Sequence, residues 1–152
     1  MHKEMASIEK DLSETFERFT QSGWRRKQNL GIKPSEVRVL LCLKILASQS
    51  DNGVSISDIS KSLAVTSPTV TQMIKHLIKS GYVQTFHDFK DKRITLLRLT
   101  DRGETLAQQA MEQYKLIFSG LIERLGEEQC HTLIVLLRQV YNYFLDIEPC
   151  DK

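Results

Sequence analysis

The sequence predicts a mainly α-helical protein with one small β-hairpin and long helices at both ends. Apolar residues recur at intervals of three and four along most of the chain, which is typical of amphipathic helices. Two short runs, Tyr82–Phe86 and Ile94–Leu99, are rich in aromatic, β-branched and other apolar residues and flank a charged stretch, which is typical of a hairpin. With 152 residues, 41% hydrophobic and 26% charged, the chain has the size and composition of one globular domain.

The N-terminal segment, from about His2 to Gln21, is expected to form one helix. Its apolar stripe consists of Ile8, Leu12, Phe16 and Phe19. The stretch Trp24-Arg25-Arg26-Lys27 and Gly31 then break the pattern. A second helix is expected from Pro34 to about Ser48, because proline fits the first turn of a helix, where N–H groups have no intrahelical partner.

Two short helices joined by a turn are predicted next, and together they form a helix-turn-helix pattern. The first begins near Ser55 or Ser57 and is expected to turn Ile56, Ile59 and Leu63 inward. The second is expected to have Ser67 as its N-cap and Pro68 at its first position. Gly81 ends it. Its expected buried face consists of Val70, Ile74, Leu77 and Ile78. Helix pairs that bind nothing show the same pattern.

After the hairpin, Thr100 is expected to cap a long helix that Gly126 ends, and a last helix extends from about Glu127 to Leu145. The apolar stripes of the terminal helices exceed what the middle of the chain can cover. They therefore predict a partner, most simply a second copy of the chain. The residues expected at this dimer interface are Ile8, Leu12, Phe16, Leu121, Leu133, Leu137, Tyr141 and Phe144.

The outward face of the second short helix is polar and is a candidate DNA-reading surface. Threonine and glutamine side chains can meet base edges in a major groove, and a helix N-terminus suits a phosphate. The alternative is an ordinary solvated face. The candidate DNA-binding residues of this helix are Ser67, Thr69, Thr71, Gln72, Lys75 and His76.

The tip of the predicted hairpin, "HDFKDKR", gathers Lys90, Lys92 and Arg93, yet it also contains acid. Arginine suits a narrow minor groove. We expect the carboxylate of Asp91 to hold the Arg93 guanidinium in one direction, which reduces the side-chain entropy lost on binding. Asp88 is expected to satisfy N–H groups of the turn. The alternative is that Asp91 and Arg93 are merely a surface ion pair.

Other classes of protein fit the sequence poorly. There is no Gly-rich phosphate loop, GxSxG or HExxH motif, so we do not expect an enzyme, and we expect no cofactor. The four histidines are scattered and the three cysteines form no CxxC pair, so no metal site is expected. Cys42 lies in an apolar run and is expected to be a core thiol. No apolar run is long enough to cross a membrane and no signal peptide is evident, which predicts a cytoplasmic protein without membrane contact. The net charge of +2 neither demands nor excludes nucleic acid.

The sequence resembles the MarR family of winged-helix transcription regulators over nearly its whole length. The matching segments are "GIKPSEVRVLLCL", "SISDISKSLAVTSPTVTQMIKHLIKSGYV" and, most specifically, the wing signature "DFKDKRITLLRLTDRG". Lys33 departs from the threonine or serine cap that the family often has there. The resemblance implies a homodimer, a recognition helix in the major groove and the wing Arg93 in the minor groove. It also implies, for many members, a small aromatic or phenolic ligand that releases DNA. Trp24, Arg25 and Arg26 fall near the expected ligand pocket, or they form a phosphate-contacting cluster.

The resulting fold prediction is a winged helix-turn-helix with long N- and C-terminal dimerisation helices. We expect an N-terminal dimerisation helix and connector at 1–32, a DNA-binding lobe at 33–100 and C-terminal dimerisation helices at 101–152, together one intertwined domain. The predicted function is that of a sequence-specific, homodimeric transcriptional regulator, expected to be a repressor, on palindromic double-stranded DNA. The alternative is a winged-helix protein-interaction module without specific DNA binding.

Overall fold

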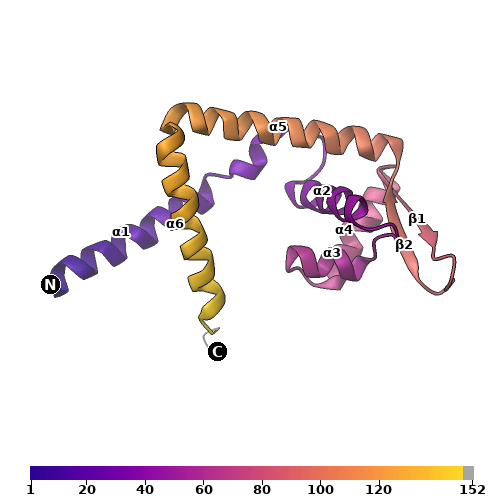
Figure 1. The fold of residues 1–152 in the computed structure, drawn as a ribbon, viewed down its shortest axis with the longest axis horizontal. Helices are drawn as coiled ribbons and strands as arrows, with labels where there is room; N and C mark the ends of the chain where they lie inside the picture. The colour runs from indigo at the N-terminus through magenta and orange to yellow at the C-terminus, as the bar shows by residue number, and fades with distance from the viewer. Residues whose placement is uncertain (149–152) are drawn as a thin grey trace. The chain divides into compact units, whose positions relative to one another are not determined.

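The computed structural model describes residues 1–148, and Cys150 lies outside this range. Two compact units are present, one covering residues 1–110 and the other beginning at Met111, and each is described by itself. The elements, in chain order, are α1 (His2–Gln21), the short 3-10 helix η1 (Trp24–Lys27), α2 (Pro34–Gln49), α3 (Ile56–Leu63), α4 (Ser67–Lys79), β1 (Val83–His87), β2 (Thr95–Leu99), α5 (Asp101–Leu125) and α6 (Glu127–Asp146). The mainly helical fold with a two-stranded hairpin is therefore confirmed (Figure 1).

The core of the first unit lies where α2, α3 and α4 pack together beside the hairpin (Figure 1). Its largest fully buried side chains include Leu40, Leu43, Ile59, Leu77 and Leu97, which come from all of these elements. Each buried leucine or isoleucine contributes about 1.5–3 kcal/mol relative to an exposed one. Cys42 is buried in the same cluster, as expected of a core thiol.

The helix-turn-helix begins with a complete capping box. The Ser55 hydroxyl accepts from the N–H of Asp58 at 3.1 Å, and the Asp58 carboxylate accepts from the N–H of Ser55 at 2.9 Å. This pair satisfies two N–H groups that the first turn of α3 leaves without an intrahelical partner. The start of α3 is therefore fixed at Ile56.

Two details of α4 differ from the expectation. The N-cap is Thr66 and not Ser67, because the N–H of Val70 donates to the carbonyl of Thr66, which makes that carbonyl the first acceptor of the helix. Ile78 is 38% exposed and not buried. It lies at the edge of a stripe centred on Val70, Ile74 and Leu77, which are all buried.

The hairpin pairs Val83 with Leu99 and continues antiparallel to His87 and Thr95. Both strands begin one residue later than predicted. The N–H of Tyr82 donates to the carbonyl of Leu77 at the end of α4, and the N–H of Ile94 donates to the carbonyl of Asp91 in the turn. These N–H groups therefore bond outside the strand ladder, whereas the carbonyls of Tyr82 and Ile94 still accept from the opposite side of the hairpin, from the N–H groups of Thr100 and Asp88.

The junction between the hairpin and α5 depends on a close backbone approach. The Thr100 hydroxyl accepts from the N–H of Gly103 at 3.0 Å and donates to the carbonyl of Gly81 at 2.6 Å, which confirms Thr100 as a cap. A Cβ atom on Gly103 would lie 2.0 Å from the carbonyl oxygen of Tyr82. Residue 103 therefore has to be glycine for α5 to lie this close to the hairpin.

Helices α1 and α6 contain no buried residue. In α1 the predicted apolar stripe is exposed along its length, and in α6 most of the predicted interface residues are exposed as well. Within residues 1–148, none of the helices combines the length and the apolar character needed to cross a bilayer.

Candidate nucleic-acid interface

The outward face of α4 presents most of the side chains predicted to read DNA. Ser67, Thr69, Gln72 and Lys75 are exposed. Thr71 is half-buried, and its hydroxyl donates to the carbonyl of Ser67 at 2.8 Å. A hydroxyl used in this way has less capacity left for a base edge, so Thr71 is a weaker candidate than Gln72. The hydroxyl of Thr69 is also engaged, in a hydrogen bond of 2.9 Å with that of Thr66.

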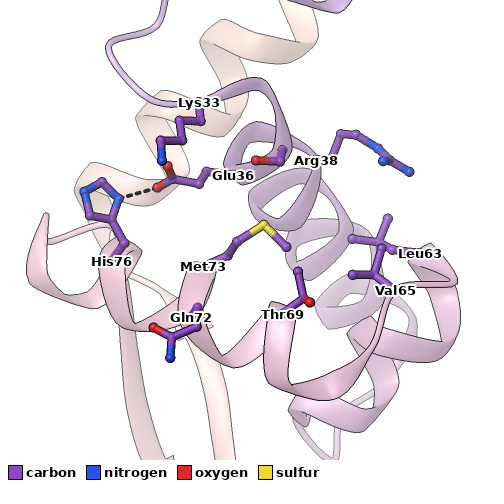
Figure 2. A pocket seen from close by; sticks show the side chains of 10 residues that line it. Lys33, Glu36, Arg38, Leu63, Val65, Thr69, Gln72, Met73 and His76 are labelled. Atoms are coloured by element: carbon purple, nitrogen blue, oxygen red, sulfur yellow. Dashed lines mark hydrogen bonds and ion pairs between the residues drawn. The ribbon is translucent and has the colours of Figure 1, made fainter.

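His76, the last of the predicted α4 residues, is engaged within the protein. Its Nδ1 donates to Oε2 of Glu36 in α2, and Figure 2 shows this contact. The Glu36 side chain is 3% exposed, whereas that of His76 is 57% exposed. The contact ties α4 to α2 and leaves much of the imidazole ring open to solvent.

Sequence reasoning missed Glu36, although a signal for it exists. Glu36, Leu40 and Leu43 lie at i, i+4 and i+7, which places all three on one face of α2. A carboxylate on a face that otherwise packs into the core needs a partner, because an unpaired buried charge is costly. The identity of the partner could not be inferred from spacing, since His76 is 40 residues away.

A hollow of about 510 Å³ lies between α2, the end of α3 and α4 (Figure 2). It brings residues of the predicted DNA-reading face together with charged residues of α2 that sequence reasoning did not select. The polar residues that line it include Lys33, Glu36, Arg38, Thr69, Gln72 and His76.

The hairpin tip has the predicted geometry. Arg93 donates to Asp91 through Nε at 3.1 Å, through Nη2 at 3.3 Å and through its backbone N–H at 3.1 Å. The Arg93 guanidinium holds the pKa of the Asp91 carboxyl below its usual range. The backbone N–H of Lys90 donates to Asp88 at 2.9 Å, so Asp88 serves the turn as expected. The Arg93 side chain is 91% exposed, so its guanidinium is held by Asp91 and still lies open to solvent.

Arg102, which was not among the predicted site residues, holds the C-terminal end of α4. Its Nη1 donates to the carbonyl of Ser80 at 3.0 Å, and its guanidinium lies 4.8 Å from the centroid of the Tyr82 ring. A cation at this end of a helix is favourable because the last carbonyls carry partial negative charge. Arg102 therefore connects the C-terminal end of α4 to the first turn of α5.

The candidate ligand-pocket residues lie in η1. The Arg25 guanidinium stands 5.0 Å from the centroid of the half-buried Trp24 ring, and Arg26 lies against Gly23. None of Trp24, Arg25 and Arg26 lines the hollow between α2 and α4. Of the candidate dimerisation residues, Leu133 is half-buried, and the others are exposed: Ile8, Leu12, Phe16, Leu121, Leu137, Tyr141 and Phe144.

Comparison with known proteins agrees with this geometry. Residues 32–103 match the winged helix DNA-binding domain family. The HTH-type transcriptional repressor MdtR of Bacillus subtilis is 25% identical over 125 residues, which are 82% of this chain and 77% of MdtR. The chain spans 66% and 58%, less than two thirds, of the length of two other curated HTH-type regulators of Bacillus subtilis.

Solved structures show the same fold. A MarR family transcription regulator superposes with a TM-score of 0.78 at 13% identity, with 96% of this chain and 95% of that chain covered. Streptococcus pneumoniae FabT, solved in complex with DNA, gives a TM-score of 0.71 at 22% identity and coverages of 95% and 99%. Residues 32–103 therefore form a winged helix domain, and the chain has the fold of the solved MarR family regulator and of FabT.

Proposed function

We propose that the protein is a homodimeric transcriptional repressor that binds a palindromic operator in double-stranded DNA. In this proposal α4 enters the major groove and Arg93 of the wing enters the flanking minor groove. The observation that carries it is the Asp91–Arg93 contact at the tip of a hairpin that directly follows a helix-turn-helix. The repressor MdtR and the DNA complex of FabT support the same reading.

The wing contact supports minor-groove binding because it makes Arg93 a pre-oriented cation. A free arginine side chain loses up to about 2 kcal/mol of rotamer entropy when it is fixed. Two hydrogen bonds from the guanidinium to one carboxylate reduce the part of this cost that falls on DNA binding. The exposed guanidinium retains N–H groups that do not face Asp91 and can meet acceptors in the groove.

Exposed apolar stripes support the homodimer. Leu12 and Phe16 of α1, and Leu137 and Phe144 of α6, are between 42% and 55% exposed in the single chain. Repeated apolar side chains at helical spacing are costly to leave in water, and a second copy of the chain covers them symmetrically. A two-fold dimer places its two recognition helices about one duplex turn apart, so we expect half-sites about 10 bp apart.

We also propose that a small aromatic or phenolic ligand near Trp24, Arg25 and Arg26 releases the DNA. An indole ring with the Arg25 guanidinium at its face, and a second arginine, Arg26, in the same short helix, match an aromatic molecule that carries negative charge. The Arg25–Trp24 contact keeps one of these cations at the ring.

The test is selection of bound duplexes from a random pool with the wild-type protein and with Arg93→Ala. Arg124→Ala, which removes an exposed arginine from the last turn of α5, is the control. We expect an enriched inverted repeat that binds Arg93→Ala more weakly and Arg124→Ala normally. Gln72→Ala should relax the preference at one base step by about 1–3 kcal/mol. No enrichment at low salt, where binding to phosphates is strongest, would refute the regulator proposal and favour a protein-interaction module.

A further inference from the structure

Glu36 occupies an unusual position for a charged residue. Glu36 is the one charged residue that is buried among residues 1–148. Its partner, His76, belongs to the outward face of α4. A buried carboxylate in an ion pair is not needed to hold two helices together, since well-packed apolar residues of similar volume do so equally well. We therefore expect a function of the Glu36–His76 contact other than packing α2 against α4.

The contact with Glu36 uses one ring nitrogen of His76 and so determines which nitrogen remains for another partner. Nδ1 of His76 is committed to Glu36, and the second ring nitrogen lies on the far side of the ring in Figure 2. The side chain of His76 is 57% exposed, so this nitrogen, Nε2, is the ring atom available for a hydrogen bond to a ligand on the outward face.

We propose that Glu36 is a positioning residue for DNA binding, which holds the His76 imidazole so that its Nε2–H donates to a phosphate of the operator. The inference rests on the proposed function, because it requires α4 to be the helix that binds DNA. A ring that donates from both nitrogens is an imidazolium, and it then lies between two anions, the Glu36 carboxylate and the phosphate.

The position of His76 along α4 favours a phosphate over a base. Recognition helices contact base edges mainly with their N-terminal residues. Thr69 and Gln72 lie in the first two turns of α4, whereas His76 lies three residues before its end at Lys79. A phosphate contact carries no sequence information, so His76 contributes affinity and not base preference.

A purely structural role for Glu36 predicts a different dependence. If the pair only tied α2 to α4, the loss of Glu36 would weaken DNA binding whether or not the imidazole is present. If Glu36 acts through His76, its loss matters only when the imidazole is present. A double-mutant cycle separates the two cases.

The experiment measures the affinity of the wild type, Glu36→Met, His76→Ala and the double variant for the selected duplex at one fixed pH. Methionine keeps the length of the side chain and removes the acceptor. His131→Ala, which removes an exposed histidine of α6, is the control. Thermal unfolding of each protein confirms that it is folded at the assay temperature.

We expect His76→Ala to weaken binding about tenfold, as for one lost hydrogen bond to a charged group. The slope of log affinity against log salt concentration should also fall by the contribution of about one phosphate contact. The preferred DNA sequence should stay the same. Glu36→Met should weaken binding by a similar factor in the wild type but less than about twofold in the His76→Ala background. Glu36→Gln, whose amide oxygen can still accept from Nδ1, should retain more affinity than Glu36→Met.

Equal losses from Glu36→Met in both backgrounds would overturn the proposal, and so would normal affinity and salt dependence in His76→Ala. If Glu36→Met does not fold, normal affinity and salt dependence in His76→Ala would still overturn the proposal. If the wild type selects no duplex, the proposed function fails and the inference fails with it. If the wild type selects a duplex but Glu36→Met causes equal losses in both backgrounds, only the inference about Glu36 fails.

Discussion

Gly103→Ala should destabilise the protein strongly, although alanine is the better helix former. The new Cβ would lie 2.0 Å from the carbonyl oxygen of Tyr82 and 2.9 Å from its carbonyl carbon. Real Cβ contacts are hardly ever shorter than 3.0 Å, so α5 or the Tyr82 peptide must shift by about 1 Å. The Tyr82 carbonyl also accepts from the N–H of Thr100 at 3.0 Å, and this hydrogen bond cannot survive such a shift unchanged.

The magnitude follows from three contributions. Overpacking against a fixed backbone costs about 3 kcal/mol, and the weakened hydrogen bond costs about 1 kcal/mol more. The higher helix propensity of alanine offsets about 1 kcal/mol. The free energy of unfolding should therefore fall by about 3 kcal/mol, which lowers the midpoint of thermal unfolding by about 6–12 °C for a chain of this size.

Gly120→Ala in the same helix is the matched control. Nothing lies within 4 Å of the position of its Cβ, so alanine there should stabilise the protein by about 0.5–1 kcal/mol. The assay is chemical denaturation followed by circular dichroism at one fixed protein concentration, because dimerisation makes stability depend on concentration. If Gly103→Ala were as stable as the wild type, the close approach of α5 to Tyr82 would be refuted.

Two further predictions concern local hydrogen bonds. Arg93→Ala should raise the pKa of the Asp91 carboxyl toward its ordinary value, because the guanidinium that lowers this pKa is then absent. A carbon-detected NMR titration measures the change. An unchanged midpoint would mean that Arg93 does not lower the pKa of Asp91. Since the pKa of Asp91 is lowered in the folded protein, the contact is fully present above the ordinary carboxyl range and is lost only as the pH falls through the lowered value, so Asp91 should not make DNA binding vary between about pH 5 and 8. Ser55→Ala removes one half of the capping box and should lower the free energy of unfolding by about 1 kcal/mol. Ser57→Ala, two residues later in the first turn of α3, should change the free energy of unfolding by less than about 0.5 kcal/mol. Equal effects of the two serine variants would mean that the cap does not stabilise α3.

Much of the fold could be predicted from the sequence because its signals are local. The bounds of α1 and α2, the Thr100 cap and the helix break at Gly126 depend on side chains within a few residues of one another. The Asp91–Arg93 contact was predictable for the same reason. The two residues are two positions apart, and a turn keeps their side chains within reach whatever the rest of the chain does.

The tertiary structure decided the features that join distant segments. The sequence places Glu36 on the buried face of α2, but only the packing of α2 against α4 selects His76 as its partner. The need for glycine at 103 arises in the same way, from the peptide of Tyr82 on another element. Periodicity fixes which side of a helix is apolar, whereas the depth and direction of packing decide which polar atoms meet across it.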